Sequence, residues 1–168
     1  MQRVLVIGSP GAGKSTFARK LAAISGLPLI HLDAEHWLPG WVPREKRDWL
    51  ERQARIVDQH SWIIDGNHGD TLDLRTHRAD TVIWLDYPTR ICLWRGTRRM
   101  ITMRGQVLAD GAPGCPEAFE PGFLLFIATF RRRKRRLIEA ALTNYHGRIL
   151  QFRRPAASAK WLAGLARP

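Results

Sequence analysis

Gly8-Ser9-Pro10-Gly11-Ala12-Gly13-Lys14-Ser15 is the stretch that decides the fold. It matches the pattern G-x-x-x-x-G-K-[ST] at every fixed position. An apolar run at residues 4–7 precedes it and predicts a buried strand, while the apolar spacing over residues 14–25 predicts a helix. Because a strand lies before it and a helix after it, the stretch is predicted to be a loop that holds phosphate groups.

The residue types in this loop suit the phosphates of a nucleoside triphosphate. Glycines let the backbone wrap closely, so that successive amide N–H groups point at phosphate oxygens, and the helix N-terminus adds a positive dipole end. Lys14 is expected to reach the β- and γ-phosphates of ATP, and the hydroxyl of Ser15 is expected to ligate Mg²⁺. The predicted nucleotide-binding residues are Gly8, Ser9, Pro10, Gly11, Ala12, Gly13, Lys14, Ser15 and Thr16.

Strand and helix patterns alternate along the whole chain. Strands are predicted at residues 2–7, 29–32, 62–64, 81–85 and 148–152. Helices are predicted at residues 14–25, 44–59, 89–102 and 123–142, with a short helix after the last strand. Since parallel strands need crossover connections, this alternation predicts an α/β fold with a mostly parallel sheet. The Gly- and Pro-rich loop at residues 105–122 is long enough to serve as a lid.

An acidic residue for the Mg²⁺ shell is expected at the end of a hydrophobic strand. Asp65 and Asp86 both stand in such a place. Asp65 is preferred because Gly66-Asn67 follows it and lets the backbone approach a ligand closely, whereas Tyr87-Pro88 after Asp86 is typical of a helix entry. The predicted metal ligands are therefore Ser15 and Asp65.

A second carboxylate, Asp33, follows the strand at residues 29–32 and is the candidate that orients or deprotonates an acceptor hydroxyl. His36 and Trp37 are candidate walls of the acceptor pocket. A partly buried position that supports the fold is an equally weighted alternative for Trp37. His31 lies within the strand pattern and is interpreted as a packed core residue. A metal site formed by these histidines and acids is the disfavoured alternative, because their spacings match no common zinc pattern.

Basic residues are concentrated on both sides of the long loop. Residues 90–136 contain eleven Arg and Lys residues against three acids, in a chain whose net charge is +12. Phosphoryl transfer is catalysed largely by positioning and by cations on the transferring group, so a lid that carries arginines suits this chemistry. Together with Lys14 and Asp33, the candidate catalytic residues are Arg95 and Arg99 before the loop and Arg132 after it.

Length and composition limit the remaining possibilities. The 168 residues, 45% of them hydrophobic, suit a single domain, residues 1–168, with a lid insertion at about residues 103–130. The apolar runs are too short for a signal peptide or a membrane span, so a soluble cytoplasmic protein is expected. Cys92 and Cys115 form no Cys-x-x-Cys pair and are interpreted as free thiols.

Several motifs together resemble those of adenylate-kinase-like P-loop kinases and, more closely, those of the DNA topology modulation (FlaR-related) proteins. The resemblance covers nearly the whole chain. Its motifs are the loop at residues 8–15, His31-Leu32-Asp33 with Trp37-Leu38-Pro39-Gly40-Trp41, residues 62–67, Asp73-Leu74-Arg75, Asp86-Tyr87-Pro88, Leu93-Trp94-Arg95 and Gly114-Cys115-Pro116-Glu117. It implies a three-layer α/β/α P-loop NTPase fold, a strand order of 2-3-1-4-5 and an arginine-rich lid between the fourth and fifth strands.

The resemblance also implies roles for individual residues. Asp65 corresponds to the Asp of the kinases' Asp-Gly-Phe-Pro-Arg motif, which here reads Asp65-Gly66-Asn67-His68-Gly69. The arginine that binds an acceptor phosphate in nucleoside monophosphate kinases is therefore missing, and Arg75 is its candidate substitute. Arg95 is expected near the ATP base, with Arg98 or Arg99 beside the phosphates.

Two functions follow from these patterns. The favoured one is an ATP-dependent phosphotransferase that moves the γ-phosphoryl group of MgATP to a small acceptor near Asp33 and Trp37. The alternative is a nucleic-acid-associated P-loop NTPase, which the +12 charge and the family resemblance suggest. No helix-turn-helix, RNA-binding aromatic motif or basic tail supports that alternative. The acceptor, the choice of ATP or GTP and the oligomeric state are left open by the sequence.

Overall fold

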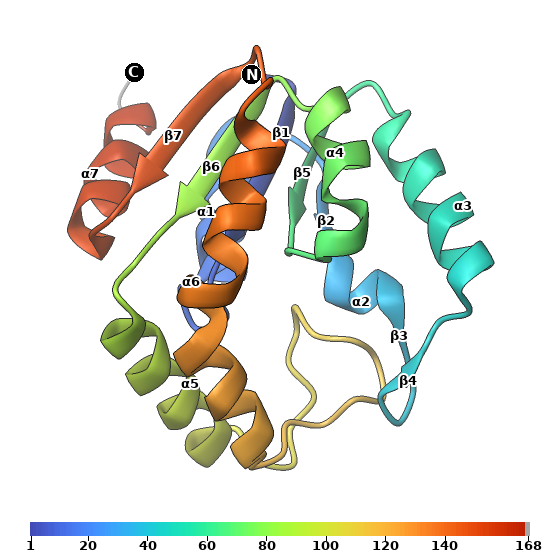
Figure 1. Cartoon of the computed structure of the whole chain (residues 1–168), viewed down its shortest axis with the longest axis vertical. Coiled ribbons are helices and arrows are strands. Elements are labelled where there is room, and N and C mark those ends of the chain that lie inside the picture. Colours follow the sequence, from blue (N-terminus) through green and yellow to red (C-terminus); the bar gives the residue numbers. More distant parts are fainter. Residues whose placement is uncertain (167–168) are drawn as a thin grey trace.

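A five-stranded parallel sheet forms the centre of the protein in the computed structural model, which describes residues 1–166 (Figure 1). Its order is β2-β5-β1-β6-β7. The strands are β1 (Arg3–Gly8), β2 (Leu29–His31), β5 (Trp62–Asp65), β6 (Thr81–Leu85) and β7 (Arg148–Phe152). The predicted order 2-3-1-4-5 is confirmed, since the numbers differ only because β3 (Trp37–Leu38) and β4 (Val42–Pro43) form a separate antiparallel hairpin.

Helices connect the strands and cover both faces of the sheet (Figure 1). They are α1 (Lys14–Ser25), α2 (Leu32–His36), α3 (Lys46–Val57), α4 (Leu72–Arg78), α5 (Thr89–Thr102), α6 (Pro121–Leu142) and α7 (Pro155–Leu165), with a 3-10 turn η1 (Gly69–Thr71) before α4. None of them combines the length and the apolar character that crossing a lipid bilayer requires, within the described residues.

The alternation of side chains along β1 shows how the three layers are held together. Leu5 and Ile7 point into one core, which α3, α4 and α6 complete, while Val4 and Val6 point into the other, which α1 and α7 help to complete. All four side chains are 0% exposed. Fully burying one aliphatic side chain of this kind stabilises a protein by about 1.5–3 kcal/mol, so this central strand anchors both layers. The predicted α/β/α architecture is confirmed.

The carboxyl ends of the strands meet at one edge of the sheet. Asp65 pairs in register with Val6 on one side and with His31 on the other, and Gly8 pairs with Leu85. The loops that leave these residues therefore start close together, at the edge where open α/β sheets bind ligands.

Two parts of the predicted architecture are corrected. β2 ends at His31, and Leu32 begins the short helix α2 where the sequence pattern predicted one more extended residue. The irregular loop covers residues 103–120, because α6 begins at Pro121, a residue that suits the first turn of a helix. Ile127 and Phe130 are 0% and 5% exposed, so residues 121–130 belong to a packed helix. We call residues 103–120 the lid loop.

Candidate active site

The phosphate-binding loop offers free hydrogen-bond donors at the start of α1. Gly13 is the N-cap residue, with φ 86° and ψ 31°, and no side chain caps the helix. Ala12 N–H donates to Ser9 O at 3.0 Å, which closes the loop. The amide N–H groups of Gly11, Gly13, Lys14 and Ser15 find no acceptor among residues 1–166. Orphan donors and a helix dipole at one point make a site for anionic phosphate oxygens.

The loop is pressed against α5, which explains why residue 11 is glycine. A Cβ atom on Gly11 would lie 2.2 Å from the carbonyl oxygen of Cys92, and its φ is +78°. From the same helix, Arg95 Nη1 donates to Ala12 O at 3.3 Å, and its guanidinium lies over the Tyr87 ring at 5.9 Å. Arg95 therefore holds the phosphate-binding loop against α5 through the backbone carbonyl of Ala12.

A groove of about 470 Å³ runs along α5 next to this contact. Its lining residues are Trp94, Arg95, Arg98, Arg99, Thr102 and Met103. An indole, a methionine and several guanidinium groups suit a flat base and its phosphates. The groove thus agrees with the expectation that Arg95 lies near the base of the nucleotide, which stays a prediction.

Four of the predicted site residues, from four different elements, lie close enough to influence one another's charge. Burial lowers the pKa of Lys14, and the carboxylates of Asp33 and Asp65 oppose that shift. Arg99 adds positive charge next to both Lys14 and Asp33. The structure therefore brings together the phosphate-loop lysine, the proposed metal-ligating acid, the proposed acceptor acid and one α5 arginine.

Asp65 is buried at the end of β5, with 4% of its surface exposed. His31 Nδ1 lies 2.6 Å from Asp65 Oδ1. This hydrogen bond raises the pKa of His31 against the effect of partial burial. His31 is thus more than a packed core residue, because it fixes the orientation of the Asp65 carboxylate.

The donor set fits Mg²⁺ bound together with phosphates. Oδ2 of Asp65 and the hydroxyl of Ser15 have no hydrogen-bond partner within residues 1–166, and both are hard oxygen ligands. No group of three or more His, Cys, Asp or Glu residues in that part of the chain could hold a metal ion alone. Few protein ligands are what Mg²⁺ needs when phosphates and water complete its shell.

Asp33 lies in the first turn of α2 and points to His68, a residue that the sequence analysis did not select. His68 Nε2 is 3.1 Å from Asp33 Oδ1. Desolvation raises the pKa of Asp33. The hydrogen bond with His68 and the charges of His68, Lys14 and Arg99 together lower this pKa by more than desolvation raises it. The net pKa of Asp33 therefore lies below its ordinary value, and the carboxylate, whose side chain is 68% exposed, is ionised at neutral pH.

Arg75 holds the loop that carries His68. Its guanidinium donates to His68 O and Thr71 Oγ1 at 3.0 and 2.7 Å, and also to Asn67 O and Gln53 Oε1. Arg75 is 0% exposed, and burial lowers its pKa to about 9, so it is still charged at neutral pH. The suggestion that Arg75 replaces the missing acceptor-phosphate arginine is therefore wrong, because its side chain is enclosed and occupied.

Gly66 and Asn67 have structural tasks that differ from the expected one. A Cβ atom on Gly66 would lie 2.8 Å from Cβ of the fully buried Leu32. The Asn67 amide donates to Gly8 O at 2.8 Å and accepts from Gly8 N at 3.1 Å. These residues tie the loop after β5 to the start of the phosphate-binding loop.

Aromatic rings form a wall next to Asp33. The His36 ring lies 4.7 Å from His68 and 4.8 Å from Trp37, and Trp37 lies 5.8 Å from Trp41. Trp49 packs behind them, 4.8 Å from His36, and is 7% exposed. We call His36, Trp37, Trp41 and His68 the aromatic wall. The structure thus places the predicted pair His36 and Trp37 with two further rings.

The lid loop contacts both α5 and the β3–β4 hairpin (Figure 1). Glu117 Oε2 lies 3.3 Å from Arg99 Nε, and Gly40 N donates to Gly114 O at 3.0 Å. Cys115 Sγ, 2% exposed, contacts the backbone of the hairpin at Leu38 O and Trp41 N. Lid loop and hairpin therefore form a continuous surface between the phosphate side and the aromatic wall.

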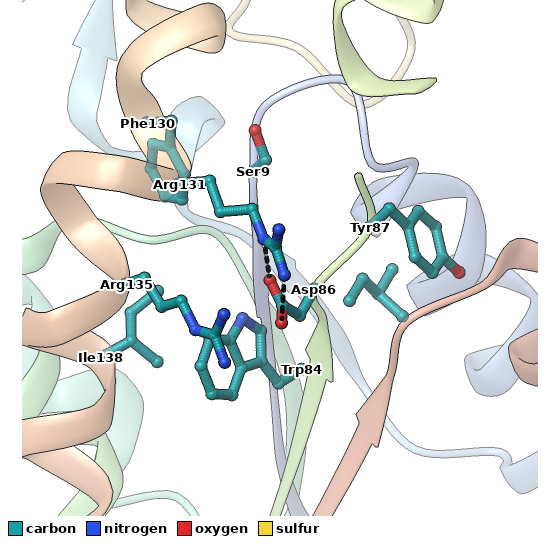
Figure 2. Close-up of a pocket in the computed structure, with 9 residues that line it drawn as sticks. Ser9, Trp84, Asp86, Tyr87, Phe130, Arg131, Arg135 and Ile138 are labelled. Atoms are coloured by element: carbon teal, nitrogen blue, oxygen red, sulfur yellow. Dashed lines mark hydrogen bonds and ion pairs between the residues drawn. The ribbon is translucent and has the colours of Figure 1, made fainter. Parts of the chain in front are cut away.

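On α6 it is Arg131, and not Arg132, that points toward the end of the sheet (Figure 2). Arg131 Nε donates to Asp86 Oδ1 at 3.0 Å, on the side where Ser9 lies. Arg132 is exposed and makes no hydrogen bond or ion pair with any described residue. Successive helix residues differ by about 100° in direction, so only one of the two can face Asp86. The structure thus brings Arg131 to the end of the sheet, and the catalytic role of Arg132 stays a prediction.

Comparisons with known proteins bear on the fold and on the class of activity. No protein-family model matches the sequence. Shikimate kinase from Rhodococcus jostii (strain RHA1) is 29% identical over 126 residues, covering 66% of this chain and 73% of the relative. A shorter match, 38% identical over 63 residues, covers 34% of this chain and 14% of the ATP-dependent protease ATPase subunit ClpY from Bacillus pumilus (strain SAFR-032).

Solved structures match over nearly the full chain. Shikimate kinase from Acinetobacter baumannii in complex with shikimate has a TM-score of 0.64 at 14% identity and covers 98% of this chain and 90% of its own. A gluconokinase from Sinorhizobium meliloti 1021 has a TM-score of 0.56 at 20% identity and covers 99% and 92%. This chain therefore has the same fold as these two kinases. Together with the sequence match, the shared fold bears out the prediction of an ATP-dependent phosphotransferase for a small acceptor. The narrower resemblance to DNA topology modulation proteins stays a prediction.

Proposed function

We propose that this protein transfers the γ-phosphoryl group of MgATP to a hydroxyl group of a small acceptor held between Asp33 and the aromatic wall. One observation carries the proposal: Asp33, on the acceptor side, lies close enough to Lys14 of the phosphate-binding loop that the charge of each acts on the pKa of the other. A residue that binds the phosphate donor and a residue that binds the phosphate acceptor, placed this close together, suit direct transfer between two bound substrates.

The two ends of the transfer use different residues. The loop amides and Lys14 would hold the β- and γ-phosphates, and Ser15 and Asp65 would hold Mg²⁺, which would supply positive charge against the phosphates. The ionised Asp33 accepts a hydrogen bond from the acceptor hydroxyl and aligns its oxygen with the γ-phosphorus, and it takes the proton as the bond to phosphorus forms. His68 positions that carboxylate, because it binds one of its two oxygens.

Arg99 is the arginine best placed to stabilise the transferring group. It contributes charge beside both Lys14 and Asp33, and it is bound by Glu117 of the lid loop. An arginine in such a position contributes about 10³–10⁵ in rate in related phosphoryl transfers. Its contact with Glu117 links the placement of this charge to the position of the lid loop.

The proposal is tested by ADP formation from MgATP with a panel of small hydroxylated acceptors and duplex DNA. Lys14→Ala and Asp33→Asn are the diagnostic variants. Lys20→Ala and Asp73→Asn are the control variants. Lys20 is an exposed lysine on α1, the helix that carries Lys14, and Asp73 is an exposed aspartate on α4. A small acceptor that raises turnover, with the gain lost only in the diagnostic variants, supports the kinase. Stimulation by DNA alone would instead support the nucleic-acid-associated NTPase.

A further inference from the structure

The acceptor side of the site has negative and aromatic groups but few available cations. Asp33 is ionised and largely exposed, and the aromatic wall stands next to it. Asp110 of the lid loop lies near enough to raise the pKa of His31, so it adds a second negative charge to this region. Kinases that bind an anionic acceptor need a cation here, and the arginines of this region show whether one is free.

Three arginines around the wall are bound by other groups. Arg44 donates to Glu35 O and to Asp48 Oδ2, both at 2.9 Å. Arg52 pairs with the Glu35 carboxylate. Arg75 is fully buried, and all of its hydrogen bonds go to uncharged acceptors of the protein.

The remaining nearby cations belong to the phosphate side. Lys14 lies in the phosphate-binding loop and donates to Ser9 O at 3.3 Å. Arg99 pairs with Glu117 and lines the groove along α5. Besides Lys14 and Arg99, the group that lowers the pKa of Asp33 is His68, whose ring lies 3.1 Å from the carboxylate. Burial, together with the charge of His68, lowers the pKa of His36, so His36 is neutral at neutral pH.

We propose that the acceptor is a hydroxylated compound without an anionic group. This inference rests on the proposed kinase function and specifies its substrate class. An anionic group would lie beside the Asp33 carboxylate, where the Arg99 guanidinium is already paired with Glu117, and like charges at short range repel. Uncharged hydroxyl groups instead donate to Asp33 and exchange hydrogen bonds with the wall histidines, while C–H faces of a ring pack on Trp37 and Trp41.

The inference sets this chain apart from its structural neighbour. Shikimate, which is bound in the Acinetobacter baumannii enzyme, is a hydroxylated ring that carries a carboxylate. The hydroxylated ring suits the wall described here, and the carboxylate does not. The acceptor is therefore expected to share the ring chemistry and to lack the acid.

The test uses pairs that differ in one anionic group: shikimate and its methyl ester, gluconate and glucitol, and nucleoside monophosphates and the parent nucleosides. Initial rates of ADP formation give kcat/KM for each member. Calorimetric titration of each member into the wild-type protein saturated with MgADP measures binding without turnover. We expect the uncharged member of the preferred pair to bind and react at least about tenfold better, as a repulsion of about 1.4 kcal/mol between Asp33 and the anionic member would give.

The outcomes separate the two proposals. An anionic member that binds or reacts better than its uncharged partner overturns the acceptor class and leaves the kinase function intact. Selective binding of uncharged members without any phosphoryl transfer supports the acceptor class and overturns the kinase function. A panel in which no member binds or reacts overturns the inference.

Discussion

Replacing Gly11 by alanine tests how the phosphate-binding loop is held on α5. Two costs can be read from the structure. A left-handed backbone, here φ +78°, costs a non-glycine residue about 1–2 kcal/mol. The new Cβ would also lie 2.2 Å from the Cys92 carbonyl oxygen, and crowding of this kind typically costs about 1–3 kcal/mol more. We expect Gly11→Ala to lower the free energy of unfolding by about 2–5 kcal/mol.

Gly26→Ala is the matched control. Gly26 has a similar φ of +71°, but a Cβ there meets nothing within 4 Å. It should therefore lose only the backbone part, about 1–2 kcal/mol. Urea unfolding of both variants gives the two free energies. MgATP titration should show weaker binding for Gly11→Ala alone, because relieving the contact moves the loop amides. Equal losses in the two variants, with equal MgATP affinity, would refute the account of the loop.

Three further predictions concern the residues behind the reacting groups. The folded-state pKa of His31 is raised above its ordinary 6.5, so the ion pair with Asp65 stabilises the protein fully below pH 6.5, and this stabilisation is lost as pH rises through the raised pKa. The free energy of unfolding, measured in urea from pH 5 to 9, should therefore fall with pH in the wild type, and His31→Gln should remove that fall. An unchanged fall in the variant would contradict the prediction. Asp65→Asn should raise the Mg²⁺ concentration for half-maximal turnover about tenfold, the lower end of what removing one metal-site interaction costs, and should leave the concentration unchanged if the residue is remote from the metal. His68→Ala should lower kcat more than it raises KM, and His68→Gln, which keeps a donor toward Asp33, should recover part of the loss; equal kcat values in the two variants would exclude the positioning role.

The elements that the sequence predicted best have strong local signals. α1 and α5 begin and end at the predicted residues, because glycines or prolines flank apolar residues at helical spacing. The strand order required more than local pattern and came from the family resemblance. The pattern failed at Leu32, since one buried leucine suits the end of a strand as well as the start of a helix.

Candidate site residues were predictable where they stand in a local sequence motif or at the end of a strand. They were much less predictable where their role depends on a side chain far away in the sequence. Lys14 and Asp65 were found from their motif and strand positions. His68 was missed because its partner Asp33 is 35 residues away and no periodic pattern marks either of them. Arg131 and Arg132 are adjacent and identical in type, so only the helix packing shows which one faces Asp86.

The central claim is that the phosphate-binding loop and Asp33 act in one transfer reaction. The most direct test measures single-turnover phosphoryl transfer and MgATP affinity together in Asp33→Asn, with the best acceptor from the panel. A positioned acid–base group contributes about 10²–10⁴ in rate, so we predict a loss of that size in the transfer rate, with MgATP affinity within about twofold of wild type. An Asp33→Asn protein that transfers the phosphoryl group at the wild-type rate would contradict the account.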